Sequence, residues 1–130
     1  MSERLEVVGT MNILITGAHG QLGHELWQEA QARGHDVKVP SHRQMDITNI
    51  KAVQNFIDRH LPVCVINAAA YTQVDKAESE KSLAFAVNKT GCTNLAQVCA
   101  KSEIPLFQVS TDYVFDGKKK APYLESDPVS

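Results

Sequence analysis

A chain of 130 residues that is 43% hydrophobic and 22% charged has the size and balance of one globular domain with its own core. Its formal net charge of −2 supplies no basic field for nucleic acid or an anionic membrane, so we expect neither partner. No apolar run approaches the roughly 20 residues of a membrane span, and the first residues do not form a signal peptide, which predicts a cytoplasmic protein. The cysteines Cys64, Cys92 and Cys99 lack the close pairing of a zinc or redox motif and are expected to pack in the interior.

Residues 11–16 (MNILIT) are predicted to form the first strand, because a short, β-branched apolar run is typical of a parallel strand buried on both faces. A glycine-rich turn follows as far as Gly23, and residues 25–33 are expected to form a helix that ends at Gly34. A short second strand is predicted at residues 36–39.

Strands and helices continue to alternate through the rest of the chain. Capping residues at 46–49 (DITN) lead into a predicted helix at 50–60, and a third apolar strand follows at 63–67. A long helical region at 79–101 precedes a fourth strand at 104–110. This alternation predicts an α/β fold, namely a Rossmann-type doubly wound parallel sheet with right-handed crossovers in the strand order 3-2-1-4.

The turn after the first strand contains Gly17, Gly20 and Gly23 in the pattern Gly-x-x-Gly-x-x-Gly. In such a turn the first glycine permits the tight bend, the second lets backbone approach a pyrophosphate, and the third allows helix and strand to pack closely. The helix N-terminus adds free N–H groups and the positive end of the helix dipole. The position between a predicted strand and a predicted helix favours dinucleotide binding over a purely structural glycine turn.

The choice between NAD and NADP usually depends on the residue at the end of the second strand, where an acid would hold the ribose 2′-hydroxyl. No acid stands there; Ser41, His42 and Arg43 follow instead. Arg43 can face a 2′-phosphate, which favours NADPH. The alternative is an ordinary solvated arginine in a loop, and NADH then stays open.

Three further motifs narrow the family. Asp46 and Ile47 in MDIT, residues 67–78 (NAAAYTQVDKAE) and residues 110–117 (STDYVFDG) occur in this order. Together they resemble the dTDP-4-dehydrorhamnose reductase family of extended short-chain dehydrogenases over essentially all of residues 11–130. The resemblance implies reduction of the 4-keto group of dTDP-4-dehydro-L-rhamnose to dTDP-L-rhamnose for cell-surface polysaccharide, with hydride from NADPH or NADH.

The resemblance also implies roles for residues around the coenzyme. Asp46 and Ile47 would flank the adenine, although Asp46 can equally serve as a helix cap. The small residues after the third strand would let the coenzyme ribose approach, although they can also simply pack closely. The expected coenzyme contacts are Gly17, Gly20, Gln21, Leu22, Gly23, Arg43, Asp46, Ile47, Ala69, Ala70, Tyr71, Thr72 and Asn88.

Thr111 directly follows the predicted fourth strand, at the edge of the sheet where open α/β folds bind ligands. In the family that it resembles, a Thr or Ser here hydrogen-bonds the keto oxygen of the substrate, which makes Thr111 the expected catalytic and substrate-binding residue. Asp112 would lie on the sugar-nucleotide side. The alternative for Thr111 is a turn hydroxyl that bonds its own backbone.

The sequence departs from the family at the general acid, which should come from a Tyr-x-x-x-Lys element. Tyr71, Tyr113 and Tyr123 are followed four residues later by Asp75, Gly117 and Asp127. We therefore expect a chain that is truncated after the fourth strand, lacks the substrate-binding part and is inactive alone.

The predicted organisation is an N-terminal extension at residues 1–10, because Met11 resembles a natural start, and an incomplete NAD(P)-binding domain at residues 11–130. The fourth strand would then be an exposed edge, so a homodimer formed through that surface is a hypothesis. Some members of the family use magnesium, and Glu25 falls at a matching place, but one carboxylate predicts no metal site.

Two other functions remain open from the sequence. The regulatory subunit of methionine adenosyltransferase resembles these reductases and would bind NADP without turnover. Thr111 and the run NAAAYT favour the reductase. A nucleotide-sugar epimerase or dehydratase shares the fold and the glycine turn but fits STDYVFDG less well.

Overall fold

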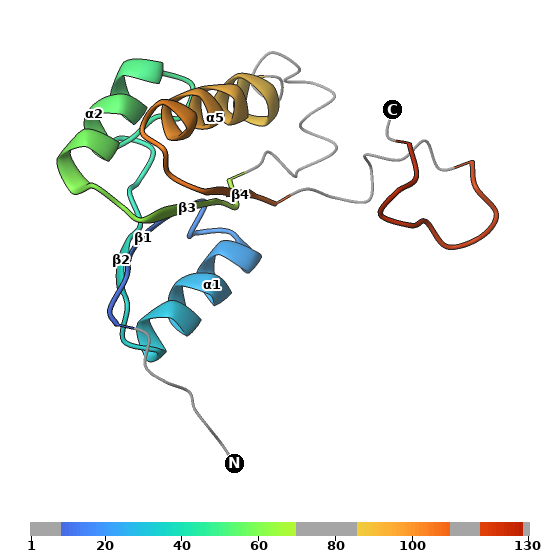
Figure 1. The fold of residues 1–130 in the computed structure, drawn as a ribbon, viewed down its shortest axis with the longest axis horizontal. Helices are drawn as coiled ribbons and strands as arrows, with labels where there is room; N and C mark the ends of the chain where they lie inside the picture. The colour runs from blue at the N-terminus through green and yellow to red at the C-terminus, as the bar shows by residue number, and fades with distance from the viewer. Residues whose placement is uncertain (1–8, 70–85, 110–117, 129–130) are drawn as a thin grey trace.

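The computed structural model describes residues 9–69, 86–109 and 118–128 (Figure 1). Within these ranges the chain forms a four-stranded, all-parallel sheet, which confirms the predicted α/β class. The strands are β1 (Asn12–Thr16), β2 (Asp36–Lys38), β3 (Cys64–Asn67) and β4 (Leu106–Gln108), and their order across the sheet is β2-β1-β3-β4.

Helices cover both faces of the sheet. Figure 1 shows α1 (Gln21–Ala32) on one face, with α2 (Ile50–His60) and α5 (Cys92–Lys101) side by side on the other. A π-helical segment, η1 (Ala86–Gly91), runs directly into α5. Because the crossover from β1 to β2 and the crossover from β2 to β3 use opposite faces, the sheet is doubly wound.

The main core lies between the sheet and the layer of α2 and α5. Leu14 of β1 and Val65 of β3 are fully buried there. Ile13 and Ile15 are also buried and alternate with Leu14 along β1, which places them on the opposite face, toward α1. The remaining members of the cluster are Met45, Ile47, Val53, Ile57, Leu95, Val98 and Cys99. β1 is therefore buried on both faces, as its continuous apolar run predicts.

The predicted strand order 3-2-1-4 is wrong. The third strand in sequence lies beside β1 and not outside β2, so the order is 2-1-3-4. The reason is that α2 crosses the face opposite to α1, and a right-handed crossover on that face carries the chain back past β1. The direction of winding consequently reverses between β1 and β3, and this switch point is where open sheets bind ligands.

Helix boundaries agree with the sequence where local signals set them. α2 has the predicted bounds, whereas α1 begins at Gln21, four residues before the predicted start. Of the predicted helical region at 79–101, residues 79–85 lie outside the described residues. The remainder is not one α-helix, because η1 precedes α5.

The described part of the tail, residues 118–128, contains turns and bends but no helix or strand. An ion pair joins its two ends: the Lys119 ammonium lies 2.5 Å from the Asp127 carboxylate. Cys99 is buried, while Cys64 and Cys92 are partly buried. Burial raises the pKa of the Cys64 and Cys99 thiols. Among the helices that the structure describes, none combines the length and the apolar character needed to cross a membrane.

Candidate coenzyme site

The turn between β1 and α1 depends on Gly17, whose φ of +76° is a conformation that L side chains rarely adopt. A Cβ on Gly17 would lie 2.5 Å from the carbonyl carbon of Ala68 and from the amide nitrogen of Ala69. The Gly20 N–H closes the turn by donating to the Gly17 carbonyl at 3.0 Å. At the switch point, the backbone after β1 therefore packs directly against the backbone of the segment after β3, with no side chain between them.

The other two glycines of the motif differ in what they permit. A Cβ on Gly23 would lie 2.0 Å from the Gly17 carbonyl oxygen, so the first turn of α1 packs on the end of β1 only because this side chain is absent. A Cβ on Gly20 would meet only that same oxygen, at an ordinary 3.4 Å. The fold therefore requires Gly17 and Gly23, whereas the described part of the chain leaves room for a Cβ at Gly20.

Among the described residues, no side chain caps the N-terminus of α1. Gly20 is the capping residue and forms no side-chain hydrogen bond, and the first turn holds no acidic residue. The N–H groups of Gln21, Leu22 and Gly23 have no partner within the helix, because an α-helix leaves its first donors unsatisfied. Gln21 and Leu22 are exposed, with 48% of Leu22 accessible. This helix start presents free donors and a positive dipole end to the solvent.

A hollow of about 210 Å³ opens beside the glycine turn. One side of it comes from the end of β1 and the turn, and the other side comes from the loop between β2 and α2. Ala69, which follows β3, completes it. The lining residues are Thr16, Gly17, Ala18, His19, Pro40, His42, Met45, Asp46, Ile47, Thr48 and Ala69.

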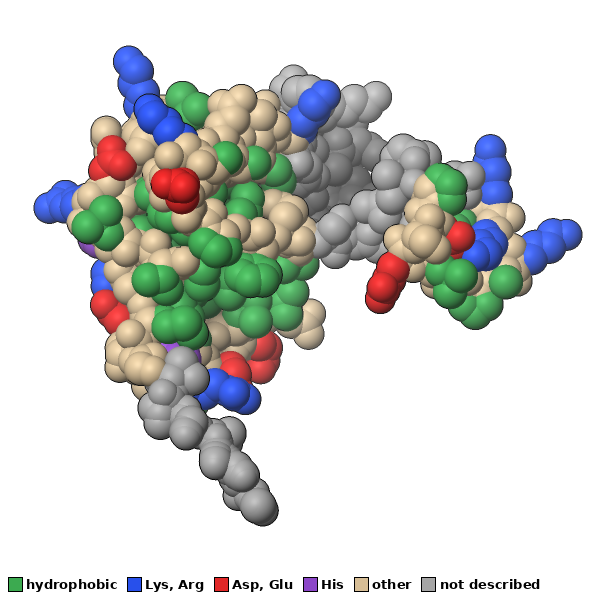
Figure 2. Space-filling view, viewed as in Figure 1, with side chains coloured by type: hydrophobic (Ala, Val, Ile, Leu, Met, Phe, Trp, Pro, Cys, Tyr) green, Lys and Arg blue, Asp and Glu red, His purple; other side chains and the backbone are tan. Residues whose placement is uncertain are grey.

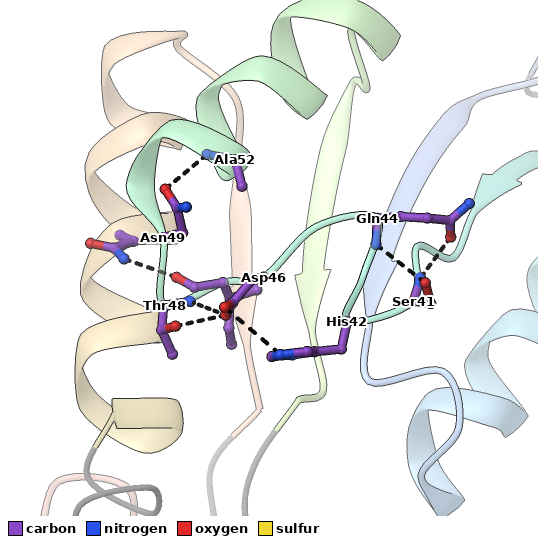
Figure 3. A network of polar contacts seen from close by, with 9 residues as sticks. Ser41, His42, Gln44, Asp46, Thr48, Asn49 and Ala52 are labelled. Carbon is purple, nitrogen blue, oxygen red and sulfur yellow. Dashed lines mark hydrogen bonds and ion pairs between the residues drawn. The ribbon is translucent and has the colours of Figure 1, made fainter.

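The polar wall of the hollow is a short turn in the loop before α2 (Figure 3). Oδ1 of Asp46 accepts from the Thr48 backbone N–H at 2.9 Å and from the Thr48 hydroxyl at 2.7 Å. Oδ2 of Asp46 lies 3.7 Å from Nε2 of His42. Asp46 therefore does not cap α2; Asn49 does, accepting from the N–H groups of Lys51 and Ala52.

The Asp46 carboxylate is held in its charged form. The hydrogen bonds from Thr48 and the nearby His42 imidazole place the pKa of Asp46 below its usual range, against the opposing effect of partial burial. A hydrogen bond to the charged form of a carboxyl group favours that form. At neutral pH the polar wall consequently carries a negative charge.

Ile47, on the apolar wall of the hollow, packs against the π-helical segment η1 and α5. Ile47 is buried, and its carbonyl accepts from the Asn94 side chain at 2.9 Å. A Cβ on Gly91 would lie 2.6 Å from Cδ1 of Ile47. The Ile47 side chain can therefore occupy its position only because the last residue of η1 is a glycine. A π turn widens the helix and often occurs beside functional sites.

Asn67 joins three segments at the carboxyl edge of the sheet and is fully buried. Its Oδ1 accepts from the Thr16 hydroxyl at 2.5 Å and from the Ala69 N–H at 3.1 Å. Its Nδ2 donates to Oε1 of Gln108 at 2.7 Å and to the sulfur of Cys92 at 3.4 Å. A buried amide with its partners in place stiffens the edge against which the hollow is built.

The structure gathers part of the predicted set. Gly17, Asp46, Ile47 and Ala69 line one hollow. The remaining glycine-turn residues are not among its lining residues; they follow His19, which is, and they are Gly20, Gln21, Leu22 and Gly23. Arg43 is exposed and is not among the lining residues. The other predicted residues give no side-chain geometry: Ala70, Tyr71, Thr72, Thr111 and Asp112 lie outside the described residues, and Asn88 lies in η1 with its side chain outside them.

Several residues at the site were not predicted. His19 and His42 face the hollow from its two sides, and Pro40 and Thr48 complete the loop wall. The signal for His19, His42 and Thr48 was positional, since each adjoins a predicted site residue, whereas Pro40 adjoins none. Asn67 carried a clearer signal, because an amide at the end of the apolar run VCVIN must find partners when the strand is buried.

Among the described residues, no three His, Cys, Asp or Glu side chains gather closely enough to hold a metal ion. Glu25 is exposed on α1 and belongs to no such group within that part of the chain. The residues that the structure describes therefore lend no support to a magnesium site.

Comparison with known proteins gives consistent matches. The family model described as RmlD substrate binding domain matches residues 11–130. The dTDP-4-dehydrorhamnose reductase of Streptomyces griseus is 46% identical over 115 residues, which cover 88% of this chain and 38% of that protein.

Solved structures agree with this result. A dTDP-4-dehydrorhamnose reductase from Clostridium acetobutylicum superposes with a TM-score of 0.87 and is 43% identical, covering 92% of this chain and 43% of that one. The Bacillus anthracis dTDP-4-dehydrorhamnose reductase, solved in complex with NADP, gives a TM-score of 0.86 at 36% identity, covering 95% and 44%. The chain spans less than half the length of each of these relatives.

Proposed function

The chain belongs to the RmlD substrate binding domain family, and from this premise we propose that it forms the NAD(P)-binding part of a reductase acting on a nucleotide sugar. The observation that carries the proposal is the open start of α1, where Gly20 leaves space and no side chain of the described residues forms a cap. Support comes from the NADP complex of the Bacillus anthracis relative.

The described residues fit a dinucleotide. The free N–H groups at the start of α1 would hold the pyrophosphate, because backbone donors and the helix dipole both favour an anion there. Asp46 and Ile47 would hold the adenine, one as a hydrogen-bond acceptor and one as an apolar wall. Ala69 would leave room for the ribose at the carboxyl edge.

The nicotinamide coenzyme supplies hydride when it is bound. We propose that the whole protein reduces the 4-keto group of dTDP-4-dehydro-L-rhamnose, in keeping with the reductase names of its relatives. Thr111 would hydrogen-bond the keto oxygen, and Asp112 would contact the sugar nucleotide. Both residues stay predictions, as do contacts from Ala70, Tyr71, Thr72 and Asn88 to the coenzyme.

Calorimetric titration of the purified protein with NADPH and NADH tests the proposal. Gly20→Ala should weaken both affinities at least about tenfold, because its methyl group would occupy the space in front of the helix start. The unfolding free energy should fall by less than about 1 kcal/mol, since the methyl group meets only one atom at 3.4 Å.

Gly34→Ala is the matched control, because Gly34 lies beyond the opposite end of the same helix and has a φ of +85°. Left-handed strain should cost about 1 kcal/mol of stability without changing coenzyme affinity. The proposal fails if a folded protein binds neither coenzyme, or if Gly20→Ala binds both as tightly as the parent.

Turnover of dTDP-4-dehydrorhamnose by the whole protein separates a reductase from a protein that binds NADP without catalysis. Thr111→Val should lower kcat by about 10²-fold or more if its hydroxyl serves the keto oxygen. Tight coenzyme binding with no turnover by the parent would instead favour the regulatory function.

We also retain a homodimer and a cytoplasmic location as predictions. Figure 2 shows apolar side chains gathered between α1 and the layer of α2 and α5. Phe107 on β4, at the edge of the described sheet, is 60% exposed. Light scattering that gives a monomer at high concentration would contradict association through this surface.

A further inference from the structure

Ile47 lies between the hollow and the main core. It lines the hollow, although only 8% of its surface is accessible. It also belongs to the core cluster, together with Val53 of α2 and Leu95 of α5, which are both fully buried. A close-packed core leaves a side chain no room to retreat. If Ile47 is pushed from its position, the hollow is therefore the open direction in which it can move.

The junction of η1 and α5 contacts Ile47 through two residues. A Cβ on Gly91 would lie 2.6 Å from Cδ1 of Ile47 and 2.7 Å from its Cγ1. Asn94 is buried, and its side chain donates to the Ile47 carbonyl at 2.9 Å. Residues three apart share one face of a helix. One face of the junction therefore contacts both the side chain and the backbone of Ile47.

Helix formation alone explains neither residue. Gly91 has φ −61° and ψ −45°, the ordinary right-handed helical conformation, in which glycine is less favourable than alanine. Asparagine is also a weak helix former, and a buried amide needs a hydrogen-bond partner. Each residue instead has a contact with Ile47 that alanine could not make without a clash or a lost bond. The composition of this junction therefore suits the task of holding Ile47 in place.

We propose that Gly91 and Asn94 are positioning residues for the coenzyme, which set through Ile47 the space that the hollow offers to the adenine ring. This inference rests on the proposed coenzyme site, in which Ile47 is the apolar wall beside the adenine. It adds two residues that are not among the lining residues of the hollow. Gly91 lets the Ile47 side chain stay back from the hollow, and Asn94 fixes the backbone from which that side chain projects.

A double-mutant cycle tests the role of Gly91, with calorimetric titration of NADPH or NADH, whichever the parent binds more tightly. Gly91→Ala should raise the dissociation constant about tenfold, because the methyl group would push Ile47 into the hollow. Ile47→Ala should raise it about fivefold, because the apolar wall is lost. In the Ile47→Ala protein, Gly91→Ala should have no further effect, since the nearest remaining atom of that side chain, Cβ, lies at 3.5 Å.

A matched pair of amide deletions on α5 tests the role of Asn94. Asn94→Ala removes the donor to the Ile47 carbonyl and should raise the dissociation constant about threefold. Gln97→Ala removes an exposed amide from the same helix and should leave the affinity unchanged. The urea midpoint of each variant is measured beside its affinity. A contact that serves the fold alone would lower the midpoint and leave the affinity of the folded protein as it was.

Parent-like affinity in a folded Gly91→Ala protein would overturn the inference and leave the proposed function intact. A loss that persists in the Ile47→Ala background would do the same, since Gly91 would then act by a route other than Ile47. If Gly91→Ala does not fold, the amide pair decides, and equal affinities of Asn94→Ala and Gln97→Ala would overturn the inference. Failure of the folded parent to bind either coenzyme would overturn the proposed function as well.

Discussion

α1 and α2 begin in opposite ways. Asn49 caps α2 by accepting from two backbone N–H groups, at 3.0 Å from Lys51 and 3.3 Å from Ala52. Gly20 begins α1 and caps nothing. A capping side chain contributes typically about 1 kcal/mol to stability, and α1 begins without one directly after His19, which lines the hollow. Helix stability explains the cap at the start of α2, whereas the proposed coenzyme site would explain why α1 begins without one.

The largest loss of stability is expected at Gly23, where backbone atoms occupy the space that a side chain would need. Gly23→Ala would place a methyl group 2.0 Å from the Gly17 carbonyl oxygen, and neither backbone can yield without moving α1 away from β1. We expect a loss of more than about 3 kcal/mol in unfolding free energy, measured by urea denaturation. Gly9→Ala, where nothing lies within 4 Å, should change it by less than about 0.5 kcal/mol. A stable Gly23→Ala protein would contradict the close contact.

Removing the cap of α2 should have a smaller effect. Asn49→Ala leaves the Lys51 and Ala52 N–H groups to water and should cost about 1 kcal/mol in urea denaturation. Asn49→Asp retains an acceptor and should stay close to the parent protein. Coenzyme affinity should change little in either variant. Equal stability of Asn49→Ala and Asn49→Asp would remove the distinction drawn between the two helix starts.

Adding a cap to α1 reverses the comparison. Gly20 has the extended backbone of an ordinary capping residue, with φ −80° and ψ 171°, and has room for a Cβ. Gly20→Asp should raise the unfolding free energy by a few tenths of a kcal/mol. Its carboxylate would accept from the backbone N–H groups at the start of α1 and interact favourably with the positive end of the helix dipole. The same carboxylate should abolish coenzyme binding in calorimetry. A variant that is stabilised and still binds NADPH would separate the helix start from the proposed site.

The smallest effect concerns the loop that leads into α2. The folded pKa of Asp46 lies below its unfolded value, so its stabilising contribution is full above the unfolded pKa of about 3.9 and is lost as the pH falls through the folded value. The urea midpoint should therefore fall between pH 6 and pH 3, and fall less in Asp46→Asn. The contribution is modest because 37% of this side chain is accessible. Identical falls in both proteins would show that this carboxylate does not contribute.

Much of the fold could be predicted because its signals are local. The bounds of α2 follow from Asn49 at one end and from the break before Pro62 at the other. The start of α1 could not be predicted in this way, since Gly23 resembles a turn residue until its contact with the Gly17 carbonyl is known. The π-helical segment likewise depends on how Gly91 meets Ile47, two residues far apart in sequence.

The residues of the candidate site likewise fall into those with a local sequence signal and those whose position depends on the fold. The glycine motif predicted the tight turn at Gly17 but not the residue at which α1 begins, and the resemblance predicted Asp46 and Ile47, which line the hollow. Whether His42 or Arg43 turns toward the hollow depends on the path of a loop, for which neighbouring residues carry no pattern. The strand order was mispredicted because a strand's own sequence does not state which neighbour it joins.

The central place of β1 also sets when the site can exist during synthesis. Its partners arrive one after the other, and the contact between Thr16 and Asn67 spans 51 positions. At roughly 10 residues per second, the glycine turn waits about 5 s on the ribosome for the strand that completes its crevice. A nascent chain that ends before β3 thus carries the glycine turn without the hollow, and a coenzyme at the proposed site would stabilise only chains that have folded past β3.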